Sequence, residues 1–221
     1  MKMEDKDPST LKLRKLKCEL GQLTRPDGSS TYCQGDTCVM TSVYGPAEVK
    51  IARELIDQAT VDVVFKPKSG LPGCADKFRE ITIANTCETI LLAALHPRSS
   101  INLTVQEVQN SGSFLAACVN SCCLALLDAS VSMKETMAAV SCCINQEGNI
   151  ILDPTVKDEE ESRACLTFVF DSINKDVIST SSHGKFSADE FQSCLVTCRE
   201  ACTMVFSFYR ETMERKLSKA I

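Results

Sequence analysis

Cysteine is the residue type with the most chemical potential in this chain, which carries 14 of them beside only two histidines, His96 and His183. A cysteine nucleophile needs a histidine close in space, and neither histidine lies in a recognisable local signature. Structural zinc usually takes paired CxxC turns, because a short turn brings two thiolates to one tetrahedral ion, and the sequence contains no CxxC. We therefore expect no cysteine nucleophile, no metal site and no cofactor.

Three cysteines, Cys194, Cys198 and Cys202, recur at every fourth position. This spacing places the three sulfurs along one face of a helix, together with apolar neighbours, which is the face that a helix buries. We interpret them, and the doublets at 122–123 and 142–143, as small buried hydrophobic residues.

Acidic residues form one other group that could hold a metal ion, the run at positions 158–161. Because no matched partner acid accompanies the run, we interpret it as a solvated surface segment. The Gln-Gly-Asp sequence at 34–36 is typical of a hairpin turn and is interpreted in that way.

These residues must be positioned by strands and helices whose hydrophobic periods can be read along the chain. Alternating or short apolar runs predict strands at 17–23, 30–34, 37–44, 60–66, 100–108, 137–144, 149–153, 164–170 and 176–181. Apolar residues at helical spacing predict helices at 76–95, at 114–127 and from a capping box at 187–190 to about residue 216. We expect a single α+β domain over residues 11–221 with a mixed β-sheet, packed helices and a long C-terminal helix, after a flexible segment at 1–10.

Composition narrows the classes of function. Hydrophobic residues make up 44% of the 221 residues, which is typical of a packed globular protein. The net charge of -5 argues against an independent nucleic-acid binder that relies on bulk positive charge. We find neither an apolar leader at the N-terminus nor an apolar stretch of roughly 18 residues, so we expect reduced thiols and no membrane association.

Specific local sequences within this order of elements resemble the RNase PH family. The matching stretches are 25–28 (RPDG), 34–37 (QGDT), 43–47 (VYGPA), 95–98 (LHPR), 152–155 (LDPT), 166–171 and 206–210. The resemblance extends over about residues 11–217 and implies the RNase PH fold, of the ribosomal protein S5 domain 2 type. Within the family, the chain is most similar to ring subunits of the eukaryotic RNA exosome.

The resemblance also implies where catalytic residues would stand. Active family members are phosphorolytic 3′ to 5′ exoribonucleases that hold phosphate in a Gly-Gly-Thr-Arg turn before the central helix and use two acids six residues apart. Here Ser113 and Phe114 occupy the last two positions of that turn, and Glu159 and Cys165 occupy the two acid positions. A further phosphate-site arginine falls at Ala75. Losing the arginine and one acid predicts a degenerate site, since one preorganised electrostatic contact is typically worth a factor of about 10² to 10³ in rate.

We therefore expect a non-catalytic ring subunit that scaffolds RNA processing, including rRNA processing, and RNA degradation in the nucleus, nucleolus and cytoplasm. Its implied partners are other RNase PH-like ring subunits, S1/KH cap subunits and RNA. The candidate RNA contacts flank the first helix: Lys66, Lys68, Lys77, Arg79 and Arg98.

Two alternatives remain open at this stage. The first is an exosome-independent homodimer that binds nucleic acid, RNA or DNA, and assists or performs nuclease work such as DNA degradation in dying cells. The second, which we favour least, is a phosphorolytic enzyme that is still active.

Overall fold

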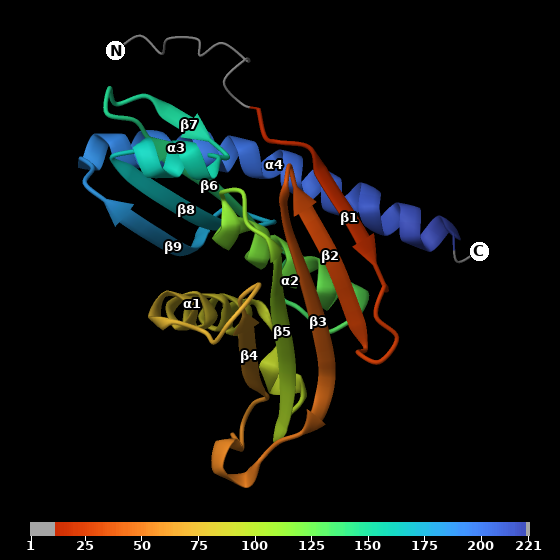
Figure 1. The fold of residues 1–221 in the computed structure, drawn as a ribbon. Helices are drawn as coiled ribbons and strands as arrows, with labels where there is room; N and C mark the ends of the chain where they lie inside the picture. The colour runs from red at the N-terminus through yellow and green to blue at the C-terminus, as the bar shows by residue number, and fades with distance from the viewer. Residues whose placement is uncertain (1–11, 220–221) are drawn as a thin grey trace.

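The computed structural model describes residues 12–219, which form nine strands and four α-helices (Figure 1). The predicted flexible segment, residues 1–10, lies outside the described residues. The strands are β1 (Leu16–Leu20), β2 (Gly28–Gln34), β3 (Thr37–Glu48), β4 (Thr60–Lys66), β5 (Ser99–Gln109), β6 (Met137–Ile144), β7 (Ile150–Leu152), β8 (Ala164–Asp171) and β9 (Val177–Gly184). The helices are α1 (Cys74–Ile90), α2 (Phe114–Asp128), α3 (Val156–Glu161) and α4 (Ala188–Lys219).

The strands divide between two sheets. The first has five strands in the order β1-β2-β3-β5-β4, in which only the β4–β5 pair is parallel. The second has four antiparallel strands in the order β7-β6-β8-β9. The predicted α+β class with a mixed sheet and a long C-terminal helix is confirmed, with the second hairpin and the later strands forming a sheet of their own.

Helix α2 lies between the two sheets and packs against β2, β3 and β6. Its sequence, FLAACVNSCCLALLD, is apolar nearly all round, and its small residues allow strands to approach on more than one side. At Gly28 an added Cβ would lie 2.4 Å from the backbone nitrogen of Ala129, so this strand requires glycine where it meets the end of α2.

A buried amide ties α2 to its neighbours. The Asn120 side chain accepts hydrogen bonds from the Ala139 N–H at 2.7 Å and from the Tyr209 hydroxyl at 2.8 Å, and it donates to the Ala139 carbonyl at 3.0 Å. Asn120 is fully buried, and these bonds satisfy its polar atoms. The contact therefore joins α2 to both β6 and α4.

The C-terminal helix α4 packs against β6 and β8 with the face that carries Cys194, Cys198 and Cys202. All three cysteines are fully buried, as the spacing predicts. The helix begins at the predicted capping box, in which the Ser187 N–H donates to Glu190 Oε2 at 2.8 Å and the Glu190 N–H donates to Ser187 Oγ at 3.3 Å.

Two predicted boundaries were wrong because distant segments supply the backbone partners. The first helix was expected to reach residue 95, but α1 ends at Ile90, whose carbonyl accepts the Lys134 N–H at 2.8 Å. Strand β3 was expected to end at the Tyr-Gly-Pro sequence, yet it runs on to Glu48 through an irregularity between Tyr44 and Ala47. Pro46 lies within that irregularity, a position where a strand tolerates proline.

One further expectation gains detail from the structure and one needs correction. The acidic run, interpreted as a solvated surface segment, forms the short helix α3, in which no residue is fully buried and whose first turn is capped by side-chain hydrogen bonds of Thr155 and Asp158. Reduced thiols were expected throughout, whereas Cys33 and Cys38 form a disulfide. These two cysteines are cross-strand partners beside the β2–β3 turn, which brings their sulfurs together.

Candidate functional site

The turn that leads into α2 has an unusual backbone. Gly112 has φ 100° and Ser113 has φ 51°, both in the left-handed region. A Cβ at Gly112 would lie 2.3 Å from the Pro154 carbonyl oxygen, so only glycine allows this close approach. The turn before α2 is thereby packed directly against the chain between β7 and α3.

Arg14, which precedes β1, binds both sides of this junction, the α2 turn and the β7–α3 loop. Its backbone N–H and its Nε both donate to Asp153 Oδ2 at 2.9 Å, and its Nη2 lies 2.7 Å from Asp153 Oδ1. The same guanidinium donates to the carbonyls of Ser111 at 3.0 Å and Gly112 at 3.1 Å. One side chain therefore binds both the α2 turn and the β7–α3 loop.

Asp153 is an almost completely buried partner, with 1% of its side chain exposed. Burial alone would raise the pKa of its carboxyl group, but hydrogen bonds from Arg14 and Gln34 outweigh that effect and lower the pKa. The aspartate is held in its ionised form by its neighbours.

Glu159, on α3, points back to the start of α2. Its Oε1 accepts the Ser113 N–H at 2.7 Å, so a carboxylate of the chain itself occupies the helix N-terminus. Burial raises the pKa of Glu159, while the Ser113 N–H opposes the shift. The Ser113 hydroxyl donates to the Pro154 carbonyl at 3.2 Å and is directed into the junction.

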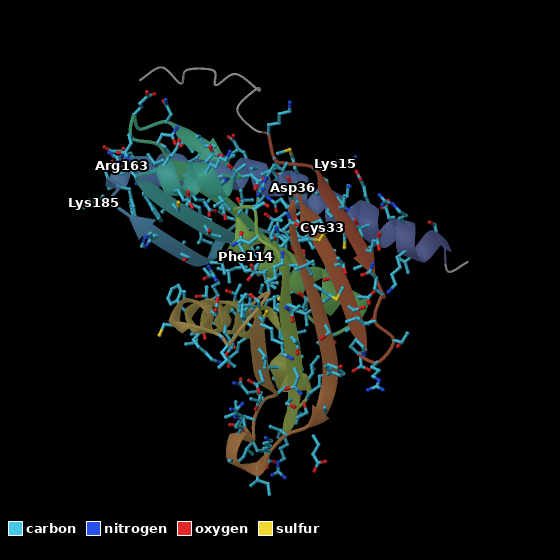
Figure 2. All side chains as sticks on the ribbon, viewed as in Figure 1. Lys15, Cys33, Asp36, Phe114, Arg163 and Lys185 are labelled. Carbon is cyan, nitrogen blue, oxygen red and sulfur yellow. A yellow bond between two sulfur atoms is a disulfide. The ribbon has the colours of Figure 1, made fainter. Side chains whose placement is uncertain are left out.

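Phe114 belongs to the packed interior, with 6% of the residue exposed. Its ring meets Phe65 edge-on with a centroid separation of 5.8 Å, and the Arg79 guanidinium lies 5.5 Å from its centroid. Figure 2 shows Phe114 near the centre of the molecule, where α1, α2 and the second sheet converge. Arg79 is also paired with Asp76, with Nη1 2.7 Å from Oδ1.

A cavity of about 800 Å³ adjoins this junction. It brings together the four positions singled out in the sequence, Ser113, Phe114, Glu159 and Cys165, and Ala75 also lines it. Cys165 Sγ lies 3.1 Å from Ser162 Oγ, and burial raises the pKa of its thiol, which disfavours a thiolate nucleophile.

Several other residues line this site that the sequence analysis did not place there, including His183, which it named only as one of two histidines. His183 lies opposite Cys165 on β9, and the hydroxyls of Ser141 and Thr167 are 2.9 Å apart on the neighbouring strands. Hydrophobic alternation identifies these strands but cannot say which face borders a cavity. No local sequence pattern marked Arg14 as a residue of this site, because its partner Asp153 is 139 residues away in the sequence.

The basic residues that were predicted to contact RNA lie in three different places. Lys66, Lys68 and Lys77 line a second cavity of about 400 Å³ between β4 and α1, with Lys77 Nζ 2.7 Å from Glu80 Oε1. Arg79 belongs to the first cavity. Arg98 precedes β5, at the end of the β4–β5 pair remote from Lys66, and its Nε lies 3.7 Å from Glu54 Oε1.

Neither a metal cluster nor a membrane-spanning helix appears in the described part of the chain. Within residues 12–219, no group of three or more His, Cys, Asp or Glu side chains is arranged to hold a metal ion. No helix in the same residues is long and apolar enough to cross a bilayer.

Comparison with protein families accounts for nearly the whole described chain. Residues 12–132 match the model of the 3′ exoribonuclease family, domain 1 (RNase PH), and residues 135–200 match that of domain 2. The chain belongs to the RNase PH family. Along the chain, the match to the first domain model ends after α2, and the match to the second begins just before β6, the first strand of the second sheet.

Relatives within the RNase PH family match this chain over most of their length. The exosome complex exonuclease RRP46 homologue of Arabidopsis thaliana is 31% identical, with 94% of each chain covered. The exosome complex component RRP46 of Saccharomyces cerevisiae is 27% identical, with 92% of this chain and 97% of the yeast protein covered.

Solved structures of the RNase PH fold agree with this assignment. The crystal structure of rice Rrp46 superposes with a TM-score of 0.89 at 32% identity, covering 93% of this chain and 97% of the rice chain. An Archaeoglobus fulgidus exosome with RNA bound to its active site matches with a TM-score of 0.79 at 14% identity, which shows the shared fold.

Proposed function

We propose that this protein is a non-catalytic ring subunit of the RNA exosome, which supports 3′ to 5′ RNA processing and degradation as a scaffold. The observation that carries the proposal is the end-to-end match with RRP46 proteins, which covers 92–94% of this chain for the plant and yeast relatives. On this proposal its partners are other RNase PH-like ring subunits, S1/KH cap subunits and RNA, in the nucleus and cytoplasm.

The non-catalytic part of the proposal is supported by the geometry around α2. Phosphorolysis needs a cation that faces the attacking phosphate, because the charge of that anion must be stabilised in the transition state. Position 114 holds a phenylalanine that packs on Phe65 instead, and Arg79 is engaged by Asp76. The second acid position holds Cys165, whose raised pKa keeps the thiol neutral.

We also propose that residues 11–221 act as one unit, although the family is described by two domain models. Helix α2 supports this, because it packs against β2 and β3 of one sheet and β6 of the other. A ring subunit built in this way would offer its partners one rigid body.

Assembly is the measurement that tests the ring role. The purified protein is analysed by light scattering alone and after addition of an RRP41-type subunit, and we expect a heteromeric complex of defined mass. A stable homodimer that refuses the heteromeric partner would contradict the proposal and favour the alternative of an independent nuclease.

Activity is tested separately with 3′-labelled RNA, inorganic phosphate and Mg²⁺, using an active phosphorolytic relative as the positive control. We expect no release of nucleoside diphosphate by the isolated protein. Release that disappears in a Glu159→Gln variant would show that the site is active and would overturn the non-catalytic assignment.

A further inference from the structure

The disulfide between Cys33 and Cys38 closes the turn that joins β2 to β3. Residues 34–37, which lie between the two cysteines, form the tip of this hairpin, and Figure 2 shows Cys33 and Asp36 at that end of the strands. The tip contacts the junction between the α2 turn and the β7–α3 loop. We propose that this disulfide is a redox-sensitive clamp, which holds the hairpin tip against the junction when it is closed and loosens the junction when it is reduced.

Thr37 connects the hairpin tip to the α2 turn. Its hydroxyl accepts the Ser111 N–H at 3.1 Å and donates to the Gly112 carbonyl at 2.7 Å. Thr37 is buried and directly precedes Cys38. A covalent bond at Cys38 therefore limits how far the Thr37 hydroxyl can move from its two partners.

Gln34 connects the tip to the other side of the junction. It follows Cys33 directly, and its side chain hydrogen-bonds to the buried Asp153 carboxylate. The Tyr32 hydroxyl donates to Gln34 Oε1 at 3.1 Å and helps to orient the amide. The two residues that bind the junction are thus the immediate neighbours of the two bonded cysteines.

The two sulfurs lie on the face of the sheet that can be reached from outside. Gln34 and Thr37 are buried on the face that packs against α2, and successive side chains of a strand point to opposite faces, so Cys33 and Cys38 point away from α2 and are partly exposed. The cross-strand partner of Cys33 on β1 is the exposed Lys17. An ammonium group beside a cysteine favours the thiolate, which is the form that exchanges with disulfides.

Closure of the clamp consumes an oxidant, for which we name a low-molecular-weight disulfide such as oxidised glutathione. The thiolate of one cysteine attacks this disulfide and releases one reduced thiol, and the second cysteine then attacks the mixed disulfide and releases the other. One S–S bond breaks and one forms, while the two released thiols carry the two electrons and two protons that the cysteines lose. Reduced glutathione reverses both steps.

The clamp rests on the proposed function in one respect, the expected location in the nucleus and cytoplasm. Thiols are kept reduced there, and a disulfide in such a compartment is typically transient and redox-sensing. The ring role is decided by the mass of an assembly, whereas the clamp is measured on the isolated full chain. Either proposal can therefore fail while the other holds.

The first experiment measures the redox equilibrium of the pair. A full chain with Cys74→Ser, which removes an exposed thiol that would also react, is equilibrated with mixtures of reduced and oxidised glutathione. Remaining thiols are alkylated, and mass spectrometry of the peptides gives the fraction in which Cys33 is bonded to Cys38. We expect this fraction to pass from low to high as the share of oxidised glutathione rises, with the same midpoint from both directions. A bond that stays closed in reduced glutathione alone, or a pair that stays open in oxidised glutathione alone, would overturn the proposal.

Hydrogen exchange then measures whether the junction responds. We expect the Ser111 amide to exchange roughly tenfold faster or more after reduction, because its acceptor on Thr37 is no longer held in place. The Ala139 amide, which donates to Asn120 in a part of the core away from the hairpin tip, is the internal control and should keep its rate.

A chain with both Cys33→Ser and Cys38→Ser cannot close the clamp and is the matched variant. We expect it to show the fast Ser111 exchange in oxidised and in reduced glutathione alike. If this variant does not fold, the unmodified chain with its thiols alkylated after reduction takes its place. Equal Ser111 exchange in the closed and open forms would show that the disulfide does not control the junction, and would overturn the proposal.

Discussion

At the scale of single residues, the site depends on charges that are satisfied inside the chain. Asp153 is held by Arg14, and the start of α2 is held by Glu159. The sequence singled out Glu159 and Cys165 because family resemblance marks positions along the chain. It could not reveal Arg14, since a pairing across 139 residues leaves no local pattern.

Replacing Arg14 tests the importance of this pairing. We expect Arg14→Ala to lower the free energy of unfolding by about 3–5 kcal/mol, because it leaves the Asp153 carboxylate buried without its partner. Denaturant unfolding measures the change. Lys15→Ala is the control, since the neighbouring Lys15 is exposed, and an equal loss in the two variants would contradict a specific role for Arg14.

The lowered pKa of Asp153 predicts a dependence of stability on pH. A carboxyl group whose pKa is lower in the folded protein stabilises the fold above its unfolded pKa, and this contribution is lost as pH falls through the folded value. The ordinary value is 3.8, so the difference in unfolding free energy between the unmodified chain and Asp153→Asn should be constant near pH 7 and shrink below about pH 4. A difference that grows on acidification would contradict this assignment.

At the scale of elements, the hydrophobic period was sufficient to predict α2, α4 and most strands, because burial on one face repeats along each of them. It failed at the end of α1, where residues near position 133 take over the backbone hydrogen bonds. It also missed α3, whose stability depends on a local cap in an acidic segment. The hydrophobic period therefore cannot predict the ends of helices and strands that are decided by tertiary contacts.

The contact between the α2 turn and the β7–α3 loop can be tested with a pair of glycines. Gly112 and Gly70 both have positive φ, but an added Cβ at Gly112 would lie 2.3 Å from the Pro154 oxygen, whereas nothing lies within 4 Å at Gly70. We expect Gly112→Ala to lower the free energy of unfolding by at least about 2 kcal/mol more than Gly70→Ala does, as measured by thermal or denaturant unfolding. Both substitutions strain a backbone with positive φ, but only the Cβ at position 112 also clashes with a neighbouring atom. Equal costs would mean that the loop moves aside freely.

At the scale of the whole molecule, the net charge of -5 leaves little general attraction for RNA. The lysines of the second cavity, Lys66, Lys68 and Lys77, come from β4, the loop after it and α1. Figure 1 shows this region at the side of the molecule remote from the C-terminal end of α4. Any contribution of this chain to an RNA path would therefore be local.

We expect Lys66→Ala combined with Lys68→Ala to weaken RNA binding by an assembled ring and to reduce the slope of log affinity against log salt concentration by about 1.4, the value for two contacts with single-stranded phosphates. Fluorescence anisotropy at several salt concentrations measures both quantities. Lys185→Ala is the control, because this exposed lysine lies between β9 and α4. An unchanged slope in the double variant would place the RNA elsewhere.

The pairing of Arg14 with Asp153 also has a consequence for protein synthesis. The arginine is synthesised 139 residues before its partner, and the Asn120 amide of α2 meets Tyr209 only when the chain is nearly complete, 89 residues later. The two sheets can be joined through α2, β6 and the Arg14–Asp153 pair once residue 153 has been made, but the contact between Asn120 and Tyr209 forms only after α4 is synthesised. A premature stop codon in α4 before position 209 would therefore leave the buried Asn120 amide without its Tyr209 partner.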